Sequence, residues 1–262
     1  MKPLFRLLTE LSSRKWISRL TGAFAKSEAS RRLIPWFAKS YGIRIDDAEK
    51  AIAEYRTLNE FFTRRLKPGL RPIDESPDAL LSPVDALVTG MGPIQAGTML
   101  NVKGQDYTVE ELLNRSPRTV NYRCGFYFVL YLSPTDYHRI HSPATGAIVE
   151  KERVKGKVYP VNDFGLRHMK RVLSRNERLI TYIDHECGEI AVVKVGAMNV
   201  SSIRYAEPLP DRVERGGDLA YFEFGSTVVL LTEDGTFTPR ADLKTGDKVR
   251  MGERLGTLIE KA

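Results

Sequence analysis

The spacing of apolar residues changes along the chain near residue 67. In the first 24 residues most of them recur at intervals of three or four, which is the spacing of one helix face. The members of the first such series are Leu4, Leu7, Leu8, Leu11, Ile17, Leu20 and Phe24. Basic residues largely occupy the positions between them. The pattern predicts an amphipathic, cationic helix, or a pair of such helices, at the start of the chain.

Helical signals continue as far as residue 66. Asp46 with Glu49, and Thr57 with Glu60, have the spacing of capping boxes, in which the first side chain accepts a hydrogen bond from the amide three residues later. The Pro-Gly pair within residues 67–72 then ends the helical pattern. We therefore expect a helical region over residues 1–66 and a second domain over residues 67–262.

From residue 80 onward the chain consists of β-branched and aromatic runs separated by Gly, Pro, Asn or Asp. Such runs predict strands, and the longest, residues 126–132, has the length of a buried strand. Short helices are expected near residues 109–114 and 166–173. The predicted fold class is α+β, with N-terminal amphipathic helices followed by a mostly antiparallel, β-rich body that contains a few short helices.

Positive charge is concentrated in the first 40 residues. They contain nine Lys or Arg and two acidic residues, which accounts for the whole formal net charge of +7. A neutral body with one basic arm argues against a nucleic-acid groove spread over the fold. It predicts instead that a single segment of the chain attaches the protein to a partner or surface.

Both tryptophans of the chain, Trp16 and Trp36, lie in this basic arm. Aromatic rings settle at a bilayer interface, and Lys and Arg side chains reach anionic head groups. Contact with an anionic membrane surface is one interpretation of the arm, and packing of its apolar face on the protein's own core is the other. No apolar run approaches the roughly 20 residues of a membrane-spanning helix.

Three polar segments interrupt the strand-like body and contain the residue types of nucleophilic catalysis. Asp85 follows a proline turn, His138 and His141 lie in the segment 133–141, and Ser226 follows Gly225. An imidazole can remove the serine proton while a carboxylate fixes the imidazole tautomer. Each residue also has a plain structural interpretation, as a turn residue, a loop histidine or a strand bulge.

A metal site is not expected. The two histidines have no third ligand of suitable type close in sequence. Cys124 and Cys187 stand far apart without a zinc-type spacing, so we expect two inert thiols in a reducing compartment.

Several motifs in register resemble those of the phosphatidylserine decarboxylase proenzyme family over nearly the whole chain. They are Asn59-Glu-Phe-Phe-Thr-Arg64, Arg71-Pro-Ile-Asp74, Ser82-Pro-Val-Asp85, Lys103-Gly104, Ser133-Pro-Thr-Asp-Tyr-His-Arg-Ile-His141, Tyr159-Pro-Val-Asn162, Asn176-Glu-Arg178, Val195-Gly196 and Gly225-Ser226-Thr227. Two positions depart from the pattern of the bacterial members, which commonly have Leu at the position of Phe224 and often Gly at the position of Ala86. Both changes lie beside the chemistry, so they concern the subfamily more than the reaction.

The resemblance implies a proenzyme that cleaves itself between Gly225 and Ser226 into a β chain, 1–225, and an α chain, 226–262. His141, with Asp85 behind it, would remove the proton of Ser226, which ends as a covalent pyruvoyl cofactor. The pyruvoyl group would form a Schiff base with phosphatidylserine, and His138 would return a proton to give phosphatidylethanolamine and carbon dioxide. The family also implies a peripheral membrane enzyme on the cytoplasmic face of the bacterial membrane, without a metal, and it allows a homodimer.

Two alternatives remain open on the sequence. A serine hydrolase would use Asp85, His141 and Ser226 on an external ester, although residues 224–228 lack the Gly-x-Ser-x-Gly elbow. A non-enzymatic module is the other, either a lipid-binding module or a swinging arm. Residues 245–256 resemble half of a biotinyl or lipoyl domain, but they have no attachment lysine at the expected hairpin apex, so the likeness indicates shared β architecture.

Overall fold

The computed structural model describes residues 21–102, 104–159, 161, 169–197, 203–223 and 226–261. The predicted amphipathic series up to Leu20, the start of the helix expected at 166–173, and the residues Phe224 and Gly225 lie outside them. Within the described residues the fold is α+β and mostly antiparallel, which confirms the predicted fold class. The division into domains at residue 67 stays a prediction.

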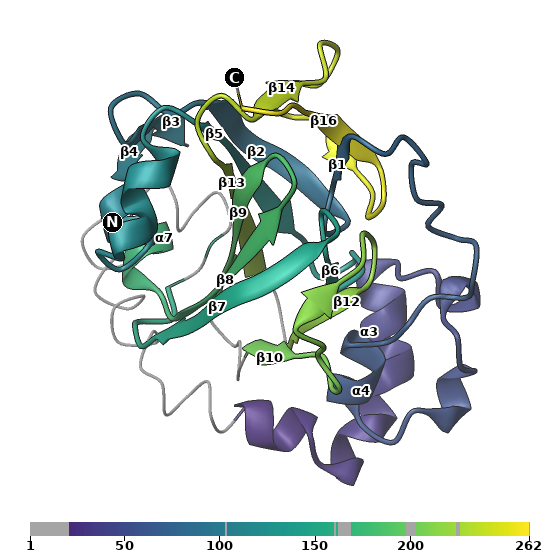
Figure 1. Cartoon of the computed structure of the whole chain (residues 1–262). Coiled ribbons are helices and arrows are strands. Elements are labelled where there is room, and N and C mark those ends of the chain that lie inside the picture. Colours follow the sequence, from purple (N-terminus) through teal and green to yellow (C-terminus); the bar gives the residue numbers. More distant parts are fainter. Residues whose placement is uncertain are drawn as a thin grey trace.

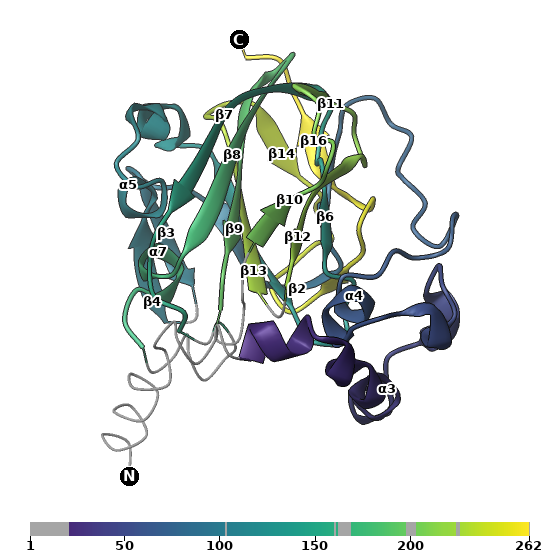
Figure 2. The same cartoon turned by 90° about the horizontal axis from the view of Figure 1, so that it is seen from below.

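The N-terminal part consists of short helices around a small core of their own. Their bounds are η1 Glu28–Leu33, α3 Ile34–Tyr41, η2 Ile45–Asp47, η3 Ile52–Glu54 and α4 Leu58–Phe62. One apolar cluster, which includes Ile34, Phe37, Tyr55, Phe61 and Phe62, holds them together. Figures 1 and 2 show α4 beside the strands β6 and β12 of the body, and α3 packs on α4 through the rings of Phe37 and Phe62.

One of the two predicted capping boxes is present in part. Thr57 caps α4 by accepting a hydrogen bond from the Glu60 amide at 3.1 Å, as predicted. The box predicted at Asp46 is wrong, because η2 begins at Ile45 after the N-cap Arg44 and has no side-chain cap. The backbone of Asp47 and Glu49 instead bonds to Lys67 and Arg65, so pairing with a distant segment overrides the local helix signal.

An eight-stranded antiparallel sheet forms the centre of the body. Its spatial order is β11-β7-β8-β9-β13-β5-β2-β15. The bounds are β11 Arg212–Val213, β7 Gly146–Val154, β8 Arg178–His185, β9 Gly188–Val195, β13 Ser226–Thr232, β5 Phe126–Leu132, β2 Ala86–Pro93 and β15 Lys248–Val249. The strand predicted at residues 126–132 is therefore confirmed, and it lies beside the strand that begins at Ser226.

Smaller elements cover the two faces of this sheet (Figures 1 and 2). One set comprises β3 Thr98–Val102, β4 Gln105–Thr108, α5 Val109–Leu112, η4 Pro117–Tyr122 and α7 Val172–Arg175. The other comprises the sheet of β1 Ala79–Leu81, β16 Arg254–Leu258 and β14 Phe237–Pro239, and the sheet of β10 Ile203–Tyr205, β12 Asp218–Phe222 and β6 Arg139–His141. Helix α5 confirms the short helix expected near residue 109.

Alternation along the central strands divides the core in two. On β13, Val229 and Leu231 belong to the cluster under α5 and α7, whereas Val228 and Leu230 belong to the cluster under the two small sheets. Both faces of β13 are therefore buried, which explains why its sequence is a continuous apolar run and not an alternating one.

Lys194 on β9 is a fully buried lysine in this core. Its Nζ donates a hydrogen bond to Thr181 Oγ1 and lies 5.3 Å from the ring centroid of Tyr205. Burial lowers its pKa well below the usual 10.5. Because the unfolded chain holds this proton more readily, the penalty for burial is present below pH 10.5 and disappears above it.

Replacing Lys194 with methionine should stabilise the fold at neutral pH by about 1–3 kcal/mol, because a buried amine is exchanged for an apolar side chain of similar length. Urea unfolding at pH 7 measures the gain in unfolding free energy of the variant over the wild type, and unfolding above pH 10.5 shows whether that gain is lost. Lys151→Met is the matched control, since Lys151 contacts the same Tyr205 ring from an exposed position. A Lys194→Met gain that is the same at both pH values would contradict the assignment of a titrating buried amine.

Candidate active site

The strand register brings three predicted segments to one edge of the large sheet. Ser226, the first residue of β13, lies opposite Leu132, the last residue of β5. On the other side of β5, Leu87 of β2 lies opposite Tyr131, so Asp85 precedes β2 at the same edge. Neighbouring strands are about 4.8 Å apart, which places the backbones of residues 226 and 85 on either side of β5, roughly 10 Å from each other.

The histidine segment continues directly from that edge. Its turn is closed by the carboxylate of Asp136, which accepts hydrogen bonds from the Ser133 amide at 2.7 Å and the Ser133 hydroxyl at 2.8 Å. The chain then enters β6, where His141 pairs with Asp218 of β12. The two histidines are therefore placed by a capped turn and by a strand, respectively.

His138 is wholly buried directly before β6. Its Nδ1 lies 2.8 Å from the carbonyl oxygen of Asp136, which can only accept, so Nδ1 carries the proton and Nε2 has the lone pair. Nε2 has no hydrogen-bond partner among the described residues. The ring contacts that of Phe62, with centroids 4.0 Å apart. Burial lowers the pKa of His138 to about 3, and the charge of Arg64 adds to this effect.

His141 has the surroundings of a base that can hold a proton. Its Nδ1 donates to the Gly216 carbonyl at 2.8 Å, and its Nε2 accepts from the Tyr137 hydroxyl at 3.1 Å. Asp218 Oδ1 is 3.7 Å from the same Nε2. Burial lowers the pKa of His141, while the Asp218 charge and the bond to Gly216 oppose that shift. An imidazolium formed here would therefore have a carboxylate beside it.

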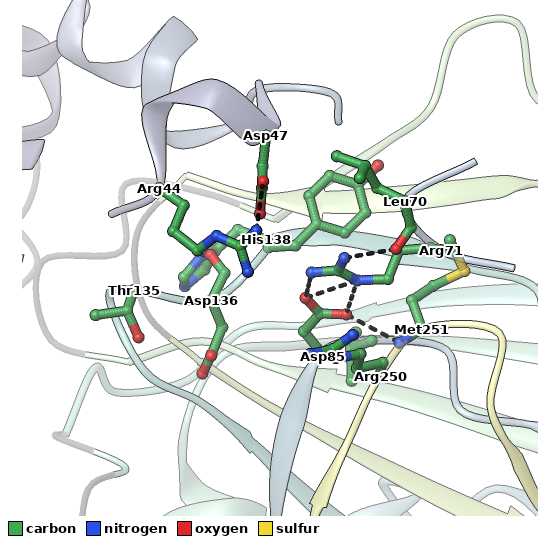
Figure 3. A network of polar contacts seen from close by, with 12 residues as sticks. Arg44, Asp47, Leu70, Arg71, Asp85, Thr135, Asp136, His138, Arg250 and Met251 are labelled. Carbon is green, nitrogen blue, oxygen red and sulfur yellow. Dashed lines mark hydrogen bonds and ion pairs between the residues drawn. The ribbon is translucent and has the colours of Figure 1, made fainter. Parts of the chain in front are cut away.

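Asp85 is held by an arginine in this structure. Its carboxylate receives two bonds from Arg71 Nε, at 2.8 and 3.0 Å, a further bond from Arg71 Nη2, and one from the Met251 amide at 2.9 Å (Figure 3). Both side chains are largely buried. The predicted contact between Asp85 and His141 is not among the interactions of the described residues, and the carboxylate within 4 Å of His141 is that of Asp218.

Asp218 is the residue that sequence reasoning missed. Burial would raise its pKa, but Arg139, His141 and Arg65 together hold the pKa below its usual range. Only the pairing of β12 with β6 brings it to His141, so no local motif could have indicated it.

A cavity of about 550 Å³ opens beside Asp85. Residues of the helical part, including Arg44 and Arg64, form one wall, and Asp85, Tyr137 and Lys248 of the body form the other. Within the described ranges no group of three or more His, Cys, Asp or Glu side chains could hold a metal ion. Nor does that part of the chain contain a helix long and apolar enough to cross a membrane.

Comparison with known proteins decides the family. The family model described as phosphatidylserine decarboxylase matches residues 58–257, a span that includes Asp85, both histidines and Ser226. The chain belongs to the phosphatidylserine decarboxylase family. A phosphatidylserine decarboxylase proenzyme of Geobacillus kaustophilus (strain HTA426) is 43% identical over 259 residues, covering 99% of this chain and 98% of the relative. One of Bacillus thuringiensis (strain Al Hakam) is 41% identical over 258 residues, covering 98% of each.

Membership of the phosphatidylserine decarboxylase family confirms the predicted resemblance and the predicted type of enzyme. It also agrees with a chain made as a proenzyme that acts in phospholipid metabolism. The serine hydrolase alternative is not favoured by these findings.

Proposed function

We propose that the chain cleaves itself between Gly225 and Ser226 and then converts phosphatidylserine to phosphatidylethanolamine and carbon dioxide with a pyruvoyl group made from Ser226. The observation that carries the proposal is the register that sets Ser226 opposite Leu132, directly before the histidine segment. Membership of the phosphatidylserine decarboxylase family supports the substrate.

In the cleavage step His141 acts as the base at Nε2, once the Tyr137 hydroxyl has moved from that atom. The Ser226 oxygen bonds to the Gly225 carbonyl carbon, the peptide C–N bond breaks, and the freed nitrogen takes the proton, leaving an ester. Loss of the Cα proton of residue 226 then expels the Gly225 carboxylate. Tautomerisation and hydrolysis of the resulting enamine release ammonia and leave the pyruvoyl group.

Two carboxylates are proposed to assist His141. The family resemblance gives the orienting role to Asp85, whereas Asp218 lies nearer to the imidazole in this structure. Either charge would stabilise the imidazolium.

The fit of a pyruvoyl group to this edge is supported by polar atoms left without partners there. His138 Nε2 and Thr227 Oγ1 are both buried and have no hydrogen bond among the described residues. The pyruvoyl carbonyl would supply the electron sink for decarboxylation. His138 has its lone pair on Nε2 in this structure, so it would first have to take up a solvent proton on that atom and then deliver it to the substrate Cα after carbon dioxide leaves.

We further propose that the enzyme binds peripherally to the cytoplasmic face of the bacterial membrane through its helical part. Trp36 is 64% exposed on α3, and Phe24, Leu33 and Tyr41 are exposed close to it in sequence. The opposite side of α3 packs in the helical core through Ile34 and Phe37. Exposed Arg31, Arg32 and Lys39 add the charge that anionic lipids attract.

Intact-mass measurement of the purified protein tests the self-cleavage. We expect two chains, with the chain 226–262 lighter by one ammonia than the serine-headed peptide. Ser226→Ala should stay whole because its side chain has no nucleophile, and Ser174→Ala on α7 should cleave normally. A full-length wild-type chain that never cleaves under native conditions, and hydrolyses esters, would point to the serine hydrolase.

A further inference from the structure

The cavity beside Asp85 contains more positive charge than its carboxylates neutralise. Arg44 pairs with Asp47 at 3.1 Å, and Arg71 pairs with Asp85. Glu253 at the rim binds Arg240, and the Asp136 carboxylate accepts hydrogen bonds from Ser133 while its charge interacts with Lys248 from beyond ion-pair distance. The lining cations that remain without an ion pair among the described residues are Arg64, Lys248 and Arg250.

Arg64 is the unusual member of this group. It is only 5% exposed, and its Nε has no hydrogen-bond partner in the part of the chain that the structure describes. Its other bonds are long, at 3.4 Å to the Phe61 carbonyl and 3.5 Å to the Thr135 carbonyl. The charges of Asp85 and Asp47 act on it from a distance and its guanidinium lies 5.2 Å from the centroid of the Phe61 ring, but no carboxylate of the described residues forms an ion pair with it. A buried guanidinium without an ion pair is costly, so an added anion would be stabilised here.

We propose that this cavity binds the phosphodiester of the substrate head group, with Arg64 as the buried ligand and Lys248 and Arg250 at the exposed mouth. The inference rests on the proposed substrate. A guanidinium offers a planar fork of donors that matches two phosphate oxygens, and a phosphodiester bound there would neutralise the charge.

Neighbouring residues fit a head group in this position. Tyr137, next to the proposed proton donor His138, lines the same cavity, and Arg64 is near enough for its charge to act on His138. In a serine phosphodiester only two bonds separate the ester oxygen from the Cα that would receive the proton. Phosphate at Arg64 and Cα near His138 are therefore compatible within one head group.

Calorimetric titration of the uncleaved Ser226→Ala chain at low salt tests the site. The probes are glycerophosphoethanolamine, which has the phosphodiester but no carboxylate, inorganic phosphate, and serine, which has the carboxylate but no phosphate. Glycerophosphoethanolamine should bind best, and Arg64→Gln should weaken it by about tenfold to a hundredfold through the lost charge-assisted bonds. The double variant Lys248→Ala, Arg250→Ala should weaken it several-fold.

Lys244→Ala is the matched control, because Lys244 is exposed four residues from Lys248 and does not line the cavity. Unfolding by urea checks that each variant is folded, and the exposed double variant keeps the test valid if Arg64→Gln does not fold. Unchanged affinity in folded variants overturns the proposal. The proposal is also overturned if Arg64→Gln weakens the binding of serine but not that of glycerophosphoethanolamine. It is overturned as well if inorganic phosphate binds as tightly as the phosphodiester.

The outcome is independent of the self-cleavage. The titration uses a chain that cannot be processed, so a wild-type chain that fails to cleave would remove the pyruvoyl mechanism and leave the anion site untouched. Conversely, the wild-type enzyme could cleave and be active while the Arg64→Gln variant binds glycerophosphoethanolamine with normal affinity. That result would contradict only the proposed anion site.

Discussion

A chain with His141 replaced by alanine should stay at full length, whereas the His138→Ala chain should cleave and then decarboxylate phosphatidylserine about 10²- to 10⁴-fold more slowly. The difference follows from the surroundings of the two rings. His141 has Asp218 at 3.7 Å to stabilise a proton taken from Ser226. His138 has a buried, unpartnered Nε2 whose lone pair would have to take up the proton that the substrate receives. Intact mass reports the first effect, and carbon dioxide release per cleaved chain reports the second.

His185→Ala is the control for a histidine outside the site. Among the described residues, the His185 ring accepts a hydrogen bond only from the nearby Cys187 amide. This variant should cleave and react normally. The role assignment is reversed if His138→Ala blocks cleavage and His141→Ala does not. In its resting tautomer His138 has a free lone pair on Nε2, so this ring could also accept the proton of Ser226. The two variants therefore decide between the two assignments.

Asp85→Asn should also stay uncleaved and should lose about 2–3 kcal/mol of folding free energy, at the low end for a buried pair because Arg71 is partly exposed to water. The amide keeps the size of the carboxylate but removes the charge that holds Arg71. Intact mass and urea unfolding of the same preparations measure the two effects.

Two further variants show whether Asp85 acts through its charge or only through the fold. Arg71→Gln breaks the same ion pair but leaves the Asp85 carboxylate, so it should be destabilised by a similar amount and still cleave. Asp218→Asn should slow cleavage without stopping it. If Asp218→Asn alone abolishes cleavage while Asp85→Asn is processed, the carboxylate that serves His141 is Asp218.

Much of the fold and the identity of the family could be predicted from the sequence because the signals are local. The apolar run 126–132 predicts β5 without knowledge of its neighbours, and Thr57 predicts the start of α4. The residue types Asp, His and Ser indicate nucleophile chemistry at Asp85, His141 and Ser226 for the same reason.

Side-chain partners could not be predicted, because they depend on pairing between segments far apart in sequence. Asp218 reaches His141 only through the register of β12 with β6. The failed box at Asp46 has the same origin, since the backbone there bonds to the segment before Pro68. The positive charge of Arg64 is visible in the sequence, but its burial without a carboxylate is visible only in the fold.

The position of β13 has a consequence for the order of events in the life of the protein. A cut before Ser226 would leave the C-terminal piece with a central strand of the large sheet, bonded on one side to β5 and on the other to β9. The same piece supplies β14 and β16 to the small sheet that includes β1, and β15 to the edge of the large sheet. Neither piece would have a complete core alone, so in the proposed self-cleavage folding would have to precede cutting. After cutting and denaturation, refolding would require the association of two separate chains, so its yield would depend on protein concentration. Refolding of the uncut chain is unimolecular and lacks this dependence.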